Sequence, residues 1–251
     1  MKKGEFSLAN KWGGRLIETI YDDIASVYED LYSSEHNKKV IESENAFLKK
    51  LMNHHYDGKD VLDAGCGTGF LIDLLGLKEN GYVGYDISNK MIEQARKKYP
   101  KHKFVKMDFM ESNLLNSYDF LFSIFSVSDY VDYDFIYKAY DVLRNNGIFM
   151  STFINADNPF TMECLKKTGH EYELTKYTYN QLRHYLSNSN FIWYYIVEIP
   201  DLLNIRPHPH GIVSYAKVTE VIDMEANIRN PLKPAKYFFV IEEKDETQLK
   251  S

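Results

Sequence analysis

The chain has 251 residues, of which 44% are hydrophobic, enough to bury the core of one sizeable domain. Its formal net charge of −6 gives no general attraction to nucleic acid phosphates or to an anionic membrane. We expect no secretory signal in the polar residues 1–14, and no run approaches the eighteen or so apolar residues of a membrane helix. With two cysteines, Cys66 and Cys164, we expect no disulfide framework and a reducing, cytoplasmic location.

Helical patterns dominate the N-terminal part of the chain. After the polar arm, an amphipathic helix is predicted over residues 15–32, because apolar residues recur there at steps of three and four. These residues are Leu16, Ile17, Ile20, Ile24, Ala25 and Tyr28. A second helix is predicted over about residues 38–53, and Asp57-Gly58 marks the turn before the first strand.

A short strand, a glycine-rich loop and a helix follow, beginning at Val61. The apolar pair Val61-Leu62 leads to Asp63, and the loop carries glycines at positions 65, 67 and 69. Glycine permits a sharp backbone turn and the close approach of a ligand, so this arrangement is typical of a nucleotide-type cofactor site. The spacing G-x-G-x-G is one residue shorter than the dinucleotide fingerprint, which disfavours a dehydrogenase.

The next two predicted strands each end in an acid. Asp86 follows the glycine loop at a spacing that suits hydrogen bonds from two ribose hydroxyls, although it could instead cap the next turn. Asp108 ends the following strand, and a surface turn is its alternative role. Between them, Ser88 is predicted to cap a helix that Pro100 stops.

The remaining elements are predicted from apolar periodicity and turn residues. Strands are placed at 82–86, 103–108, 118–125, 148–154, 191–199 and 237–242, and helices at 134–143 and 178–186. The strand at 118–125 is apolar almost throughout, as a strand buried on both faces should be. The connection at 200–236, which contains R-P-H-P-H-G, is long enough to be functional or disordered.

The sequence D-A-G-C-G-T-G at 63–69 resembles the first motif of the class I S-adenosylmethionine (SAM)-dependent methyltransferases, and the two strand-end acids follow in the family's order. The resemblance covers about residues 20–199 and the last strand. It implies an α/β fold with a Rossmann-like, doubly wound, seven-stranded sheet whose last strand is antiparallel. We expect an N-terminal arm and helical cap at 1–45, a SAM-binding core at 46–199, a substrate lid at 200–236, and the final core strand and tail at 237–251.

The resemblance also implies the cofactor site, with SAM bound and S-adenosylhomocysteine released. The expected cofactor-binding residues are Tyr21, Tyr28, Asp63, Gly65, Gly67, Asp86, Ile87, Met107, Asp108, Phe109, Ser123 and Phe125. The family would use Tyr28 or Tyr21 to donate to the cofactor carboxylate, Asp86 to hold the ribose, and Asp108 with Phe109 to hold the adenine. Both tyrosines could instead only pack their helix onto the core.

The implied reaction is in-line transfer of a methyl group to an oxygen or nitrogen atom of a small molecule. Asp129, His208 and His210 are the candidates for a general base, although proximity alone can suffice and the histidines could be surface residues. The acidic charge and the missing Asn-Pro-Pro-aromatic motif disfavour nucleic acid. The alternatives are a methyltransferase acting on RNA or protein, and a SAM-binding module without turnover. No metal or membrane partner is predicted, and the sequence does not indicate the oligomeric state.

Overall fold

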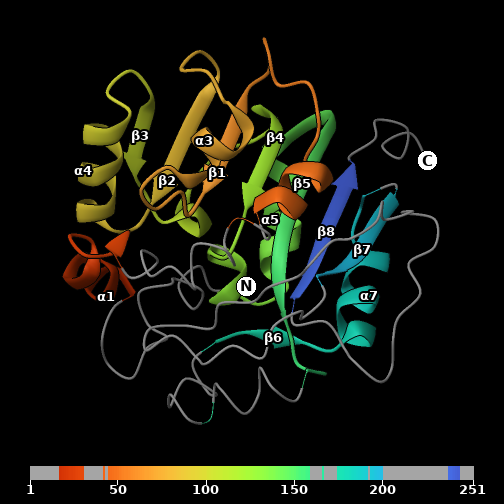
Figure 1. Ribbon diagram of the computed structural model, residues 1–251. Helices are drawn as coiled ribbons and strands as arrows, with labels where there is room; N and C mark the ends of the chain where they lie inside the picture. The colour runs from red at the N-terminus through yellow and green to blue at the C-terminus, as the bar shows by residue number, and fades with distance from the viewer. Residues whose placement is uncertain are drawn as a thin grey trace.

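The computed structural model describes residues 17–30, 42, 45–158, 166, 174–191, 193–199 and 237–243. They form a sheet with the strand order β3-β2-β1-β4-β5-β8-β7, and β6 pairs with β5 outside this path (Figure 1). The strands are β1 Val61–Ala64, β2 Tyr82–Asp86, β3 Lys103–Lys106, β4 Tyr118–Ser123, β5 Leu143–Asn155, β6 Lys176–Tyr177, β7 Trp193–Ile199 and β8 Tyr237–Glu243. The helices are α1 Ile17–Ile24, α3 Phe70–Leu75, α4 Asn89–Lys98, α5 Asp134–Val142 and α7 Tyr179–Ser187, with short 3-10 turns η3 Phe109–Glu111 and η4 Val127–Asp129.

The pairing of β1 to β6 is parallel throughout, which confirms the predicted α/β, Rossmann-like class. Strand β8 pairs antiparallel with both β5 and β7. The sheet has eight strands rather than the seven expected, because the two-residue β6 joins β5. The strand order reverses at β1, with β2 and β3 on one side and β4 and β5 on the other. In such sheets ligands bind beyond the carboxyl ends of the strands at this reversal point.

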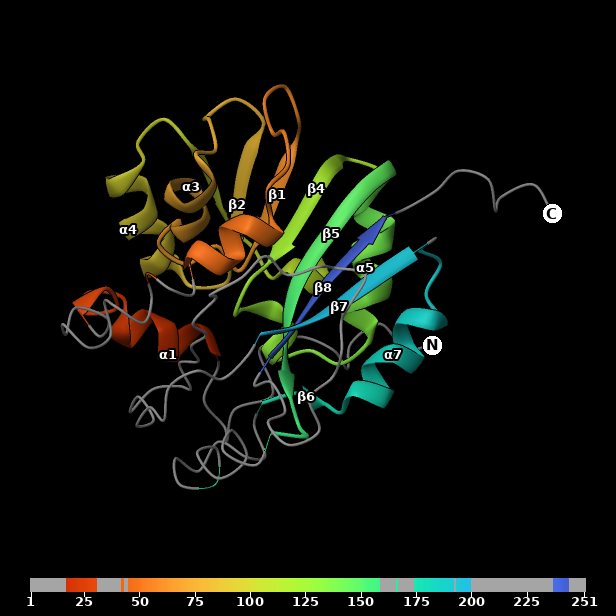
Figure 2. The ribbon, with the colours of Figure 1, turned by 45° about the vertical axis from the view of Figure 1, so that its right-hand side comes forward.

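Apolar side chains pack on both faces of the sheet. One cluster joins the helical residues 45–51, α3 and α4 to the sheet, and a second cluster joins α5 and α7 to it (Figure 2). Side chains alternate between the two along a strand, so that Phe120 and Phe122 belong to the first cluster and Leu121 to the second. All three are buried, which fits the prediction that this strand is covered on both faces.

Several element boundaries follow the capping signals. Ser88 caps α4 as predicted, since its side chain accepts a hydrogen bond from Met91 N, and α4 ends before Pro100. Thr178 and Gln181 form a capping box at the start of α7. Both signals are local, and a side-chain oxygen at the N-cap satisfies N–H groups that the helix leaves unpaired.

Two predicted boundaries differ from the structure. The N-terminal helix was expected over 15–32, but α1 ends at Ile24 and residues 25–29 form turns. The segment 144–147, which separates the predicted helix at 134–143 from the predicted strand at 148–154, belongs to β5, which starts at Leu143 directly after α5. A register shift against β4 and a left-handed Asn146 (φ 60°) accommodate the extra residues, as in a β-bulge.

Other predictions lie outside the described residues. These are the arm at 1–14, Cys164, and the proposed lid at 200–236 with His208 and His210. Within the described ranges, no helix is long and apolar enough to cross a membrane.

Candidate cofactor site

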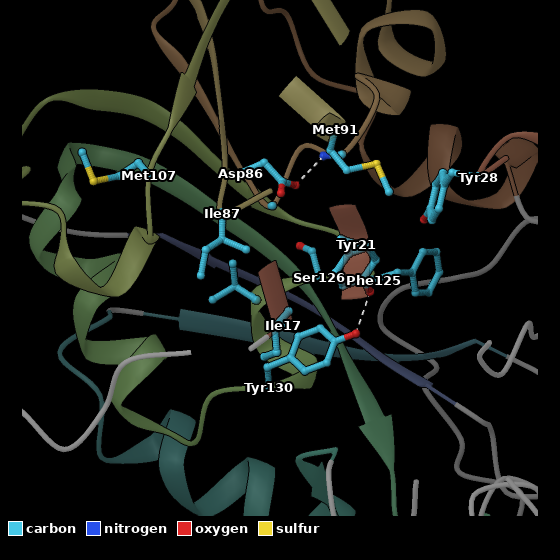
Figure 3. Close-up of a pocket in the computed structure, with 13 residues that line it drawn as sticks. Ile17, Tyr21, Tyr28, Asp86, Ile87, Met91, Met107, Phe125, Ser126 and Tyr130 are labelled. Atoms are coloured by element: carbon cyan, nitrogen blue, oxygen red, sulfur yellow. Dashed lines mark hydrogen bonds between the residues drawn. The ribbon is translucent and has the colours of Figure 1, made fainter. Parts of the chain in front are cut away.

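A pocket lies beyond the carboxyl ends of β1 to β4, where the strand order reverses (Figure 3). It is an open cleft, with about 560 Å³ of empty space when the solvent at its mouth is included. Its lining residues come from α1 and the turn after it, the glycine loop, β2, α4, the end of β3 and the loop after β4. They are Ile17, Tyr21, Tyr28, Gly65, Gly67, Asp86, Ile87, Met91, Met107, Phe125, Ser126, Val127 and Tyr130.

The glycine loop forms the part of the pocket where two distant segments touch. Gly65 adopts a left-handed conformation (φ 77°), and its N–H donates to Tyr85 O at 2.7 Å. A Cβ atom at Gly65 would lie 2.5 Å from Ser126 Cβ, closer than any side chain can tolerate. Ser126 in turn donates its hydroxyl to Ala64 O at 2.8 Å. The loop after β1 and the loop after β4 therefore fit together only with glycine at this position.

Asp86 is the carboxylate of the pocket. Its Oδ2 accepts from Gly67 N and its Oδ1 from Ser88 N, both at 2.8 Å. Each carboxylate oxygen can accept a further hydrogen bond, so two ligand hydroxyls could be held. Burial raises the pKa of Asp86 to about 6, backbone hydrogen bonds oppose this rise, and the Asp22 carboxylate adds to it. In the view of Figure 3, Asp86 and Ile87 lie between Met107 on one side and Phe125 on the other.

Aromatic side chains form another wall of the pocket. The hydroxyls of Tyr21 and Tyr130 are hydrogen-bonded at 2.6 Å, and their rings meet edge to face at 6.3 Å (Figure 3). Tyr28 packs near Tyr21, with ring centroids 6.4 Å apart. Phe125 has a left-handed backbone (φ 53°), which costs energy for a bulky residue, and its N–H donates to Thr152 Oγ1 at 2.7 Å. This hydrogen bond holds the conformation that brings Phe125 to the pocket.

Eight of the expected cofactor-binding residues line this pocket, namely Tyr21, Tyr28, Gly65, Gly67, Asp86, Ile87, Met107 and Phe125. The other four do not. Asp63 is buried and accepts from Tyr82 OH at 2.9 Å, and Ser123 shares a 3.0 Å hydroxyl contact with Ser126. Asp108 caps η3 by accepting from Met110 N at 2.9 Å, while Phe109 is buried against Phe135.

Of the three candidate general bases, only Asp129 lies within the described residues. Asp129 ends η4, between the lining residues Val127 and Tyr130, but its own side chain is not part of the lining. Its Oδ1 is buried without a hydrogen-bond partner among the described residues, and burial raises its pKa to about 8. His208 and His210 lie outside the described ranges. Those ranges contain no cluster of three potential metal-ligating side chains.

Five lining residues were not expected from the sequence, namely Ile17, Met91, Ser126, Val127 and Tyr130. Ile17 and Met91 carried only the signal of an apolar helix face, which does not distinguish a core from a pocket. The other three lie in the loop after β4 beside the candidate base Asp129, and no motif in the sequence assigns them a role. Their proximity to α1 and to the glycine loop is a long-range contact, without a local sequence pattern.

Part of the chain, including most of the pocket, is similar to known methyltransferases. A family model described as a methyltransferase domain matches residues 61–147, which include the glycine loop, Asp86 and the loop after β4. An uncharacterized protein of Methanocaldococcus jannaschii is 31% identical over 140 residues, 55% of this chain and 52% of that protein. A probable S-adenosylmethionine-dependent methyltransferase of Mycolicibacterium smegmatis is 27% identical over 99 residues, 39% of this chain and 38% of that protein. The chain thus spans about half or less of the length of these curated relatives.

Solved structures share the fold over a larger part of the chain. One is a SAM-dependent methyltransferase of Thermotoga maritima, described as a possible histamine N-methyltransferase. It superposes with a TM-score of 0.62 over 91% of this chain and 99% of its own, at 16% sequence identity. At 16% identity this likeness establishes the fold alone.

Proposed function

We propose that this protein, whose residues 61–147 match a family model described as a methyltransferase domain, is a class I SAM-dependent methyltransferase that moves the methyl group of SAM to an oxygen or nitrogen atom of a small molecule. One observation carries the proposal. The glycine loop, the Asp86 carboxylate and an aromatic wall converge on a single pocket at the reversal point of the sheet.

The proposed binding mode follows the lining residues. Asp86 accepts from the ribose hydroxyls, Ile87 and Met107 contact the adenine, and the methionine part lies against the glycine loop, where Gly65 and Gly67 have no side chain to block it. Tyr28, with Tyr21 beside it, donates to the cofactor carboxylate. The four expected residues outside the lining have other partners: Asp63 accepts from Tyr82 on β2, Ser123 contacts Ser126, Asp108 caps η3, and Phe109 packs against Phe135.

The reaction requires little beyond positioning. SAM supplies an electrophilic methyl group on a sulfonium that leaves as a neutral thioether. The protein must align an acceptor lone pair with that methyl group, and the aromatic wall excludes water from the approach. When the acceptor is a hydroxyl or an ammonium, a base must take its proton. We propose Asp129, next to the lining residues Val127 and Tyr130, and His208 and His210 in the proposed lid at 200–236 as the candidates for this role. Asp129 does not line the pocket as described and burial raises its pKa to about 8, so it would serve only if its carboxyl turned toward the acceptor, and mainly above that pH.

The charge of the pocket and of the whole chain favours a small-molecule acceptor. Among the described lining residues there is no lysine, arginine or histidine, so the pocket offers nothing to a phosphate backbone. The net charge of −6 points the same way. A small-molecule acceptor therefore has more support than RNA or protein, which become outcomes of the test.

Calorimetric titration with SAM, S-adenosylhomocysteine and NAD tests the cofactor, and a labelled-methyl screen tests the acceptor. We expect saturable binding of the first two ligands, no binding of NAD, and label transfer to a member of a small-molecule amine and alcohol panel. Absence of SAM binding would refute the proposal. Label transfer only to RNA or protein would replace the acceptor class, and binding without any transfer would favour a SAM-binding module.

Affinity for SAM is expected to depend on pH through Asp86. Burial raises the pKa of this carboxyl to about 6, so the acceptor form is present above that pH and is lost as the pH falls through it. The dissociation constant should be constant above about pH 7 and rise by up to about tenfold per pH unit below 6. Titrations between pH 5 and pH 8 would check this, and Asp86→Asn should bind weakly with no such slope. A slope that persists in the variant would assign the titration to another group.

The hydroxyl pair of Tyr21 and Tyr130 is expected to act as one unit. Tyr21→Phe or Tyr130→Phe leaves the other hydroxyl without this 2.6 Å partner, so each should raise the dissociation constant for SAM about threefold. The double variant should be no worse than either single one, because both members of the pair are gone. Titration of the three variants measures this, and additive losses would show that the hydroxyls contribute separately.

A further inference from the structure

Helix α1 closes one side of the pocket and is attached to the core by several contacts. Ile17 and Tyr21 line the pocket from this helix, and Ile17 is 2% exposed. Tyr21 reaches Tyr130 in the loop after β4, while Glu18 pairs with Lys106 at the end of β3 at 2.5 Å. Both ribbon views show α1 beside α4 (Figures 1 and 2). The pocket therefore has its present shape only while α1 is docked.

Asp22 makes the most specific of these contacts. Its Oδ1 accepts from the Ser88 hydroxyl at 2.5 Å and from Lys90 N at 3.0 Å. The carboxylate of one helix thereby satisfies a free N–H at the start of α4, where the helix dipole favours negative charge. Burial acts to raise the pKa of Asp22, but the hydrogen bonds from Ser88 and Lys90 lower it overall, so the group is charged at neutral pH.

Ser88 is hydrogen-bonded both to Asp22 and to Asp86, the carboxylate of the pocket. Its hydroxyl donates to Asp22 and accepts from Met91 N at 3.1 Å, while its backbone N–H donates to Asp86 Oδ1 at 2.8 Å. The other oxygen of Asp86 accepts from Gly67 N. A continuous chain of hydrogen bonds thus runs from α1 through Ser88 and Asp86 to the glycine loop.

We propose that Asp22 is a positioning residue that couples the docking of α1 to the orientation of Asp86, so that SAM leaves the pocket when the contact between Asp22 and Ser88 opens. The inference rests on the proposed function, which makes SAM the ligand of this pocket. Asp22 does not line the pocket, so its effect passes through Ser88. A ligand held by Asp86 orders Ser88, and an ordered Ser88 favours the docked helix.

The same helix provides a matched control. Glu18 also carries a carboxylate and also pairs with a group on the core, but its partner Lys106 is about half exposed and bonds to neither Ser88 nor Asp86. Exposed ion pairs of this kind contribute little. Neutralising Glu18 removes the same charge from α1 without interrupting the hydrogen-bond chain.

The test compares Asp22→Ala, Asp22→Asn and Glu18→Gln with the unchanged protein by stopped-flow measurement of SAM association and dissociation. Asp22→Ala should raise the dissociation rate constant about tenfold with little change in association, because a charge-assisted hydrogen bond is lost. Asp22→Asn keeps an acceptor oxygen and should raise it about threefold. Glu18→Gln should stay within about twofold. Hydrogen exchange of peptide 17–24 should slow on SAM addition in the unchanged protein and in Glu18→Gln, but not in Asp22→Ala.

The possible outcomes separate the two proposals. Absence of SAM binding by the unchanged protein would refute the proposed function and this inference together. If that protein binds SAM but all variants release it at the same rate, the inference alone is wrong. An equal rise of the SAM dissociation rate constant in Glu18→Gln and Asp22→Ala would also overturn the inference, because loss of any contact between α1 and the core would then have the same effect. Asp22→Asn keeps the test decisive if Asp22→Ala does not fold.

Discussion

Replacement of Gly65 by alanine is expected to abolish measurable SAM binding and to lower Tm by roughly 6–12 °C. The new Cβ would lie 2.5 Å from Ser126 Cβ and 2.8 Å from its hydroxyl, so the loops after β1 and β4 must move apart. Overpacking and the left-handed backbone (φ 77°) together cost about 3 kcal/mol. Calorimetric titration and thermal unfolding of the variant measure the two effects.

Two other glycines serve as controls for this substitution. Gly67 and Gly58 also have positive φ, 53° and 73°, but a Cβ at either would meet nothing within 4 Å. Alanine at either position should therefore cost only the backbone term, about 1–2 kcal/mol. Gly58 lies in the turn before β1, away from the pocket, so Gly58→Ala should leave SAM binding unchanged. If Gly65→Ala lowers Tm no more than Gly58→Ala, the close contact between the loops after β1 and β4 does not contribute to stability, and the prediction is wrong.

The second large effect is expected for Asp86→Ala, which should raise the dissociation constant for SAM by about 100-fold or more. The change removes the proposed acceptor of both ribose hydroxyls, and each hydrogen bond to a charged group contributes about 1.5–3 kcal/mol. It also leaves Gly67 N and Ser88 N without their 2.8 Å acceptor, so the glycine loop loses its orientation. Calorimetric titration at pH 7.5, where the carboxylate is charged, measures the loss.

Asp57→Asn is the control for removing an acid. Asp57 pairs with Lys78 at 2.9 Å, and its side chain is 55% exposed and distant from the pocket lining. This variant should bind SAM within about twofold of the unchanged protein. An Asp86→Ala protein that also binds within about threefold would contradict the role proposed for Asp86, whatever its stability.

The sequence predicts those parts of the fold that are determined by interactions between residues close together in the chain. The strand ending at Asp86 has its predicted bounds, and the helix after it begins at the predicted cap, Ser88. The glycine loop and the acid after β2 meet in one pocket because parallel strands end at the same edge. Periodicity, capping and turn chemistry act over a few residues, and a single sequence displays them directly.

The parts that could not be predicted depend on contacts between distant segments. Tyr130 lines the pocket next to Tyr21, and the two hydroxyls are hydrogen-bonded although the residues are 109 positions apart in the sequence. No local sequence pattern predicts this contact. Asp63 lies one residue before the end of β1, in register with Gly84 rather than with Asp86, and its partner is Tyr82 on the neighbouring strand. Which of several strand-end acids faces the ligand is decided by the packing around each one.

The fit between Gly65 and Ser126 has a consequence for how the protein is made. The two residues are about sixty positions apart, so a chain that has left the ribosome only as far as β3 lacks one wall of the pocket. Closing a loop of that length has an entropic cost that is met only when β4 pairs with β1. During synthesis, the nucleoside ligand therefore cannot assist the early steps of folding. The ligand can bind and stabilise only molecules in which β4 has already paired with β1. Adding it should therefore not stabilise a truncated product that ends before β4.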